Sequence, residues 1–116
     1  MKRRDFLTLA GAAGLSGLSA PYVAAQGAWP NRPVKLIVPY APGGASDLVA
    51  RPWADKLSQA FGQQFVVDNR GGAGGMIGTE AAARSPADGY TFLLTPNGTL
   101  TVLPHLRQLP YTPGKD

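Results

Sequence analysis

A glycine-containing loop, Tyr40 to Asp47, carries residue types well suited to binding an anion. Gly43 and Gly44 have no side chain, so a ligand can approach the backbone closely there. The first N–H groups of the following helix have no acceptor within the helix and carry a partial positive charge, which favours a carboxylate or a phosphate. Ser46 adds a hydroxyl group, and Tyr40 adds an aromatic wall. A tight strand-to-helix turn without a ligand fits the same spacing, so both interpretations stay open.

A second loop, Arg70 to Gly78, is similar to a dinucleotide-binding fingerprint but departs from it at two points. The loop follows a strand and opens a helix, as that fingerprint requires. However, Ile77 stands where the third glycine belongs, and no carboxylate lies from Thr95 to Thr99, where a ribose-binding acid is expected. A backbone nest facing an anion, or plain close packing of helix on sheet, therefore fits better than a nucleotide site.

The sequence contains no catalytic constellation. The single histidine, His105, has no evident orienting partner, and Ser46 does not lie in a G-x-S-x-G elbow. The chain has no cysteine, which excludes disulfides and thiol metal ligands. Arg70, the basic side chain beside the second loop, is interpreted as an exposed surface residue. We expect no enzymatic activity, no cofactor and no metal site.

The first loop is expected to connect a strand to a helix. The dense β-branched run at residues 34–38 predicts a buried strand. Ser46 is expected to cap the next helix, with Asp47 at its positive end. That helix is expected to kink at Pro52 and to end at Gly62. Its predicted apolar face consists of Ala50, Trp53, Ala54, Leu57 and Phe61.

The same order of elements then repeats. Residues 65–68 and 90–95 predict two further strands, and residues 76–84 predict a helix that ends before Pro86. Residues 99–106 are compatible with a further short helix. This order indicates right-handed βαβ units around a parallel sheet, an α/β fold. The three glycine-containing loops would then lie together at the carboxyl edge of the sheet.

The first 25 residues have the layout of a secretory signal peptide. Residues 2–4 form a basic head, and residues 7–20 form an apolar run that is too short to span a bilayer permanently. Residues 23–25 supply the small side chains that a signal peptidase reads. We therefore expect export to the periplasm, with no stable membrane anchor after the signal is removed.

The signal contains a paired arginine. Arg3 and Arg4, followed by Phe6 and Leu7, resemble the twin-arginine motif, although Lys2 stands where that motif usually has Ser or Thr. An ordinary Sec signal with a basic head is the alternative.

Export also changes the charge of the chain. The first 25 residues carry three basic residues and one acidic residue, so they contribute +2 of the net charge of +4. The remaining Lys and Arg residues are scattered, with no run or stripe, so we expect no nucleic-acid partner.

The motifs above resemble those of the Bug family, the periplasmic solute-binding proteins of tripartite tricarboxylate transporters. The resemblance covers essentially all of residues 26–116. The matching motifs are WPNRPV at 29–34, IVPYAPGG at 37–44, GQQFVVDNR at 62–70, GAGG at 72–75, DGYT at 88–91 and LPY at 109–111, followed by Lys115 and Asp116.

Membership of this family implies a type II periplasmic-binding-protein-like fold with two lobes. Residues 1–25 would be the signal peptide, and residues 26–116 would be the N-terminal part of the first lobe, truncated within that lobe. The family captures small carboxylates between its lobes and passes them to membrane transporter subunits. A non-functional truncated product is the main alternative, and a fragment of a nucleotide-binding α/β enzyme is a second.

The resemblance also implies ligand-binding residues. The first loop of the family contacts the ligand through backbone groups, often with bridging water. By this resemblance, the ligand-binding residues of this chain would be Tyr40, Gly43, Gly44, Ala45, Ser46, Ala73, Gly74, Gly75, Thr95 and Asn97. Two departures from the family pattern are Gly71, where a proline is usual, and Pro52 within the first helix. The identity of the carboxylate is not encoded in contacts of this kind.

Overall fold

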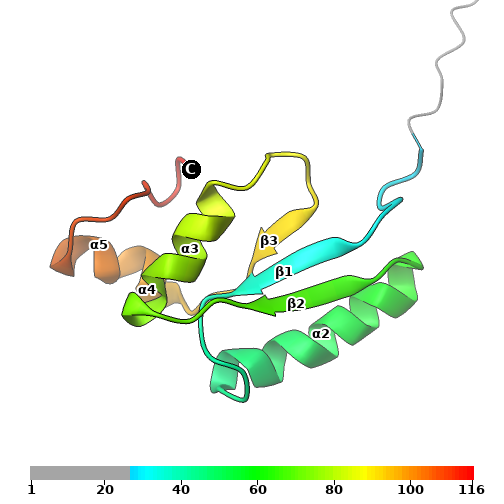
Figure 1. Ribbon diagram of the computed structural model, residues 1–116, viewed down its shortest axis with the longest axis horizontal. Coiled ribbons are helices and arrows are strands. Elements are labelled where there is room, and N and C mark those ends of the chain that lie inside the picture. Colours follow the sequence, from blue (N-terminus) through cyan, green and yellow to red (C-terminus); the bar gives the residue numbers. More distant parts are fainter. Residues whose placement is uncertain (1–26) are drawn as a thin grey trace, which may run out of the picture.

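A computed structural model of the chain describes residues 27–116 and shows a parallel sheet with helices on both faces (Figure 1). The predicted signal peptide, with Arg3, Arg4, Phe6 and Leu7, lies outside the described residues. The sheet contains β1 (Val34–Val38), β2 (Phe65–Asn69) and β3 (Thr91–Leu93) in the order β2-β1-β3. Both neighbours run parallel to β1, which confirms the predicted α/β class.

The third strand is shorter than the sequence predicts. β3 spans three residues, against the expected range 90–95. Its pairing with β1 nevertheless extends one residue further at each end. Lys35 N–H donates to the Tyr90 carbonyl at 2.8 Å, and Leu94 N–H donates to the Ile37 carbonyl at 2.9 Å.

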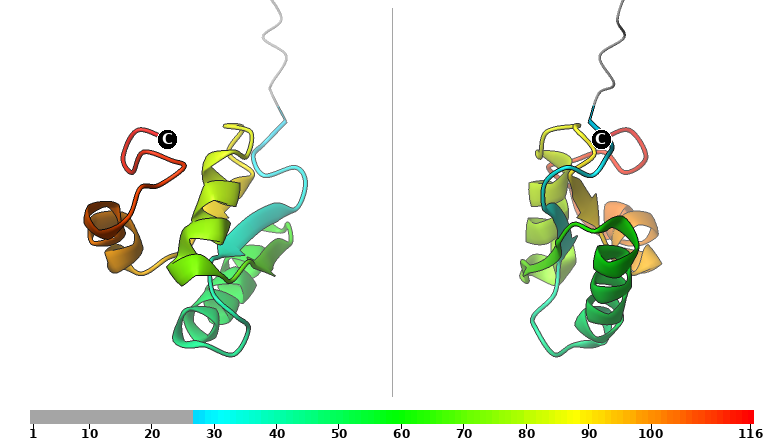
Figure 2. Two further views of the ribbon diagram at one scale, coloured as in Figure 1. Left: turned by 60° about the vertical axis from the view of Figure 1, so that its left-hand side comes forward. Right: turned by 90° about the vertical axis from the view of Figure 1, so that its right-hand side faces the viewer.

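The two longer helices lie on opposite faces of the sheet (Figure 2). The chain moves from β1 to β2 in one direction and then back past β1 to β3 in the other. Because such crossovers are right-handed, α2 (Ala45–Phe61) and α3 (Met76–Ala83) must cover different faces. Successive side chains of β1 point to opposite faces of the sheet. The core on the α2 side contains Val34, Leu36, Val38, Ala50, Ala54 and Phe65, and the buried Ile37 faces α3.

The start of α2 corrects the sequence prediction. Its N-cap is Gly44, which makes no side-chain cap, and Ser46 lies inside the helix. The expectation that Ser46 is the N-cap was therefore wrong. The reason is Asp47, whose carboxylate accepts the N–H of Gly43 and so orders this turn from within the helix.

The rest of α2 follows the prediction in part. The helix continues through Pro52 without interruption and ends at Gly62, which has the left-handed conformation (φ 66°) expected of a C-terminal glycine. Ala50 and Ala54 are buried. Trp53 is 63% exposed and Phe61 is 46% exposed, so only part of the predicted apolar face packs on the sheet.

The segment after β3 contains two short helices, α4 (Asn97–Thr101) and α5 (Leu103–Leu106), where one helix over 99–106 was expected. Beyond α5, Tyr111 is buried, and its hydroxyl has no hydrogen-bond partner among the described residues. Within residues 27–116, no helix has the length and apolarity required to cross a membrane.

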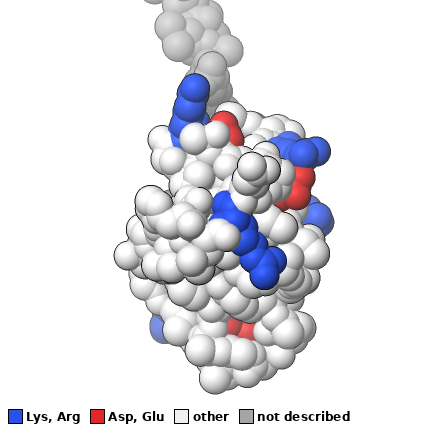
Figure 3. Space-filling view, turned by 90° about the vertical axis from the view of Figure 1, so that its left-hand side faces the viewer, with Lys and Arg blue, Asp and Glu red and all other residues white. Residues whose placement is uncertain are grey.

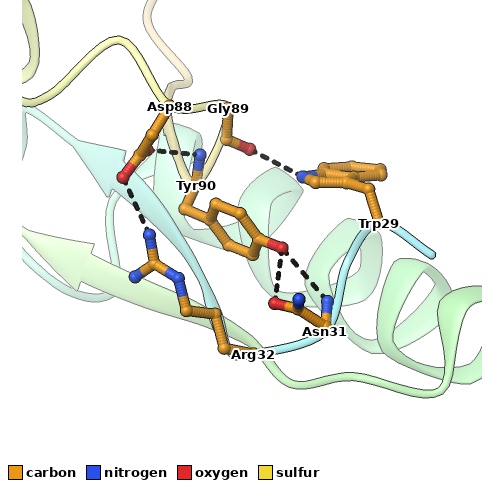
Figure 4. A network of polar contacts seen from close by, with 6 residues as sticks. All are labelled: Trp29, Asn31, Arg32, Asp88, Gly89 and Tyr90. Atoms are coloured by element: carbon orange, nitrogen blue, oxygen red, sulfur yellow. Dashed lines mark hydrogen bonds and ion pairs between the residues drawn. The ribbon is translucent and has the colours of Figure 1, made fainter. Parts of the chain in front are cut away.

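Side chains that precede β1 bind the turn before β3, at the amino edge of the sheet (Figure 4). The Trp29 indole N–H donates to the Gly89 carbonyl at 3.1 Å. The Tyr90 hydroxyl donates to Asn31 Oδ1 at 2.9 Å and accepts the Asn31 N–H at 3.1 Å. These bonds tie the segment before β1 to the start of β3.

An ion pair lies beside these bonds. Arg32 donates to Asp88 Oδ2 at 2.8 Å, and its guanidinium lies 3.9 Å from the centre of the Tyr90 ring. The N–H of Tyr90 donates to the other oxygen of Asp88, and this bond, together with Arg32, holds the pKa of Asp88 below its usual value. Both charged side chains are largely exposed.

Candidate anion-binding site at the carboxyl edge

The loops after β1, β2 and β3 meet at Tyr40. Its hydroxyl lies 2.7 Å from Thr99 Oγ1, in the segment after β3. Its carbonyl accepts a hydrogen bond from the side-chain amide of Asn69, the last residue of β2, at 3.2 Å. Gly75, from the second glycine loop, lies against the hydroxyl end of the Tyr40 side chain. The structure therefore brings the three loops together at the carboxyl edge, as the βαβ order predicted.

A buried carboxylate holds the first loop in place. Asp47 is 2% exposed. Its Oδ2 accepts the Gly43 N–H at 2.9 Å and the Arg51 Nε–H at 2.8 Å. Its Oδ1 accepts the Asn69 side-chain amide at 3.0 Å. The Arg51 hydrogen bond, followed by that of Gly43, lowers the pKa of Asp47 to about 2, so the group is ionised at neutral pH.

These contacts determine which backbone amides remain open to a ligand. The Gly43 N–H is bound to Asp47, and Gly43 has a left-handed conformation (φ 81°) that favours glycine. Leu48 is the first α2 residue whose N–H donates along the helix, to the Gly44 carbonyl at 3.0 Å. The N–H groups of Ala45 and Ser46 have no acceptor among the described residues, as expected for a helix start. Ala45 is exposed and Ser46 is half-buried.

Two glycines of the second loop pack closely against the first loop and the end of β1. Ala73, Gly74 and Gly75 have successive positive φ values of 50°, 68° and 94°. Ala73 and Gly74 are exposed, but Gly75 is buried, and a Cβ there would lie 3.0 Å from Tyr40 Oη. A Cβ at Gly78 would lie 2.6 Å from Pro39 Cα. The close approach of α3 to the end of β1 explains Gly78 without a nucleotide.

The third loop contributes a residue that the sequence did not single out. Of the two predicted residues, Thr95 is half-buried and Asn97 is exposed at the start of α4, and neither contacts Tyr40 through a hydrogen bond among the described residues. Thr99 is 4% exposed and bonds to the Tyr40 hydroxyl. The sequence offered one indication for Thr99, which is that it stands in the first turn of a helix that follows a parallel strand.

Arginine side chains near this edge already have partners. Arg70 is exposed, as expected, and donates to Asp68 at 3.0 Å, while Arg51 is paired with Asp47. On the face shown in Figure 3, charged side chains occur singly or in small groups over a largely uncharged surface. The donors at this edge that lack a partner among the described residues are therefore backbone amides. Among the described residues, no group of three His, Cys, Asp or Glu could hold a metal ion.

Glycine-rich loops at the carboxyl edge of a parallel sheet define a class of α/β ligand-binding domain. The family model described as "Tripartite tricarboxylate transporter family receptor" matches residues 49–116. The chain belongs to this receptor family, which confirms the resemblance drawn from its motifs.

Similar proteins agree with this assignment. The chain is 51% identical over 80 residues to Protein BugT of Bordetella pertussis, an alignment that covers 69% of this chain and 24% of BugT. A solved structure of a periplasmic transporter matches with a TM-score of 0.70 and 45% identity, covering 74% of this chain and 29% of the other. MatC from Rhodopseudomonas palustris with bound malate matches with a TM-score of 0.64 and 33% identity, covering 72% and 29%. The chain thus spans about a quarter to a third of the length of these proteins.

Proposed function

We propose that residues 26–116 form the first part of a lobe of a periplasmic receptor that captures a small carboxylate for transfer to membrane transporter subunits. The observation that carries this proposal is the meeting of three strand-end loops beside the open N–H groups of Ala45 and Ser46. In this proposal the residues bind and release a solute, and they catalyse no reaction.

A ligand carboxylate would accept hydrogen bonds from the Ala45 and Ser46 amides and from the Ser46 hydroxyl. Each charge-assisted bond of this kind contributes about 1.5–3 kcal/mol, and the helix dipole adds about 0.3–1 kcal/mol. The buried charge of Asp47 would repel the ligand, but Arg51 lies within 2.8 Å of it and offsets that repulsion. Tyr40, held by Thr99, would form one wall of the site.

The chemistry of a relative supports the choice of ligand. MatC was solved with malate, a small dicarboxylate, and it shares the fold of this chain. Backbone amides recognise the carboxylate oxygens of a ligand rather than the rest of the molecule. The described residues therefore indicate small carboxylates as a class and do not select one compound. A single wall of contacts leaves a ligand largely hydrated, so the 116 residues alone should bind weakly.

Backbone NMR of the isotope-labelled chain tests the proposed site. Addition of malate should shift the Ala45 and Ser46 amide resonances with a dissociation constant of about 1 mM or weaker, whereas glycerol, an uncharged control, should not shift them. Ser46→Ala should weaken the binding further by removing the hydroxyl contact. Malate-dependent shifts elsewhere with none at Ala45 and Ser46 would remove this loop from the site.

We further propose that residues 1–25 are a signal peptide of the twin-arginine type. Replacement of both Arg3 and Arg4 by Lys preserves the charge of the basic head but removes the arginine pair that the receptor reads. We expect the precursor of this double variant to remain in the cytoplasm, as measured by cell fractionation. Normal processing in the periplasm would instead identify a Sec signal.

A further inference from the structure

Successive backbone amides precede and open α2, and the first two of them are already occupied. The Gly43 N–H donates to Asp47 Oδ2 at 2.9 Å. The Gly44 N–H donates to the Ala41 carbonyl at 3.4 Å. Only the two amides of the proposed carboxylate site follow before the buried Asp47. An anion at the start of α2 therefore meets a short row of backbone donors.

This number of donors suits a carboxylate better than a tetrahedral anion. A carboxylate has two oxygens, and two adjacent N–H groups can donate to both. Sulfate and phosphate present more oxygens, and proteins bind them with longer nests of N–H groups or with arginine forks. The arginines near this edge already have carboxylate partners, Arg51 with Asp47 and Arg70 with Asp68. A tetrahedral anion would therefore lose more hydration than the described residues replace.

The occupation of the Gly43 amide is a fixed feature of the site. Asp47 Oδ1 accepts the side-chain amide of Asn69 at 3.0 Å, and the same amide group donates to the Tyr40 carbonyl at 3.2 Å. Asn69 is the last residue of β2, so these bonds anchor the carboxylate to the sheet as well as to the loop. Asp47 cannot turn away from an incoming anion without breaking them.

The charge of Asp47 acts in the same direction. Its carboxylate accepts three N–H bonds and is ionised. Its backbone directly follows Ser46, so the charge lies within about one helical turn of the open amides. Arg51 offsets only part of this charge, because its side chain is 56% exposed and water screens it. Repulsion grows with the charge of the approaching group, so a doubly charged head group is repelled more strongly than a carboxylate.

We propose that Asp47 is a specificity-determining residue of the anion site, which it restricts to carboxylates by excluding sulfate and phosphate. It occupies the Gly43 amide and places a negative charge behind the amides of Ala45 and Ser46. This inference rests on the proposed function, because it concerns the same site. A residue that only held the loop in place would change the affinities for all anions alike.

Amide titrations of the isotope-labelled full chain with malate and with sulfate, at constant ionic strength, test the proposal. Both probes are dianions at neutral pH, but malate divides its charge between two carboxylates, whereas sulfate carries it on one centre. The dissociation constant for sulfate, measured at Ala45 and Ser46, should be at least about tenfold higher than that for malate. Asp47→Asn removes the charge, so this ratio should fall by about tenfold, mainly through tighter binding of sulfate.

Two further variants make the test specific. Asp88→Asn also removes an acid, but at the amino edge, and should leave the ratio unchanged. Arg51→Gln removes the counter-charge of Asp47, so the ratio should rise by about threefold or more. Because Arg51 is exposed, this variant can be measured even if Asp47→Asn fails to fold.

The outcomes separate this proposal from the site on which it rests. Equal affinity of the wild-type chain for malate and sulfate would overturn the proposal and leave the carboxylate site in place. The same holds if Asp47→Asn weakens both probes equally, or if Arg51→Gln leaves the ratio unchanged. A wild-type chain without malate-dependent shifts at Ala45 and Ser46 would instead overturn the site itself, and this proposal with it.

Discussion

The two edges of the sheet are held together in different ways. At the amino edge, Arg32 and Asp88 form an ion pair whose side chains are 56% and 41% exposed. At the carboxyl edge, the carboxylate of Asp47 is almost fully buried and binds groups from α2, from the first loop and from the end of β2. Exposed ion pairs contribute about 0–1 kcal/mol because water screens them.

This difference shows how the fold can leave backbone amides open for the proposed anion site without using an unpaired charged side chain. The amino edge uses side chains to fasten the start of the first strand to the turn before the third. The carboxyl edge uses one buried carboxylate to hold a loop, and the amides of Ala45 and Ser46 stay open. The comparison predicts that changes at the carboxyl edge have larger effects than equivalent changes at the amino edge or on the surface.

The largest expected effect is that of Gly78→Ala. The added Cβ would lie 2.6 Å from both Pro39 Cα and the Arg70 carbonyl oxygen, and both are backbone atoms. Overpacking of this kind costs about 1–3 kcal/mol or more, so the urea midpoint followed by far-UV circular dichroism should fall. The matched control is Gly98→Ala, whose Cβ would meet no atom within 4 Å. An equal fall in both variants would show that α3 does not press on the end of β1.

The second prediction concerns acid. The folded-state pKa of Asp47 is lowered to about 2, so its contribution to stability is fully present above the ordinary pKa of about 3.9 and is lost as the pH falls from about 4 to about 2. Asp47→Asn should lower stability at neutral pH and flatten this acid dependence, as measured by urea unfolding at a series of pH values.

Asp88→Asn is the matched control for the acid experiment. The pKa of Asp88 is also lowered, chiefly by the Tyr90 N–H, so its contribution is lost in the same direction. Because Asp88 is more exposed than Asp47, its replacement should change the acid profile less. A larger change for Asp88→Asn would reverse the ranking of the two edges.

A smaller effect than those of Gly78→Ala and Asp47→Asn is expected at the contact between Thr99 and Tyr40. Thr99→Val keeps the shape of the side chain but removes the hydroxyl, so it should cost about 0.5–1.5 kcal/mol. Tyr40→Phe should cost a similar amount, and the double variant should cost less than the two together, because both single changes remove the same bond. Urea unfolding of the four proteins measures this coupling. Strict additivity would mean that the bond does not join the first and third loops in solution.

The sequence by itself was sufficient to predict the three strands, the two longer helices and their order. The β-branched run of β1, the glycine after α2 and the glycine loops after the strands are local signals, because each depends on the conformational preferences of adjacent residues. The right-handed crossover rule then determines the parallel sheet and the opposite placement of α2 and α3. The family motifs add the receptor class, since they extend along almost the whole of residues 29–116.

Only the tertiary structure showed which residues hold together the loops of the proposed site. Asp47 meets Asn69 across 22 positions of sequence, and Tyr40 meets Thr99 across 59. Neither contact leaves a local pattern, because each partner obeys the preferences of its own loop or helix. The same limit explains Trp53, which has the spacing of a core residue but is 63% exposed. Burial and hydrogen bonding between distant segments depend on how whole elements pack, and that packing is set only when the three strands share one sheet.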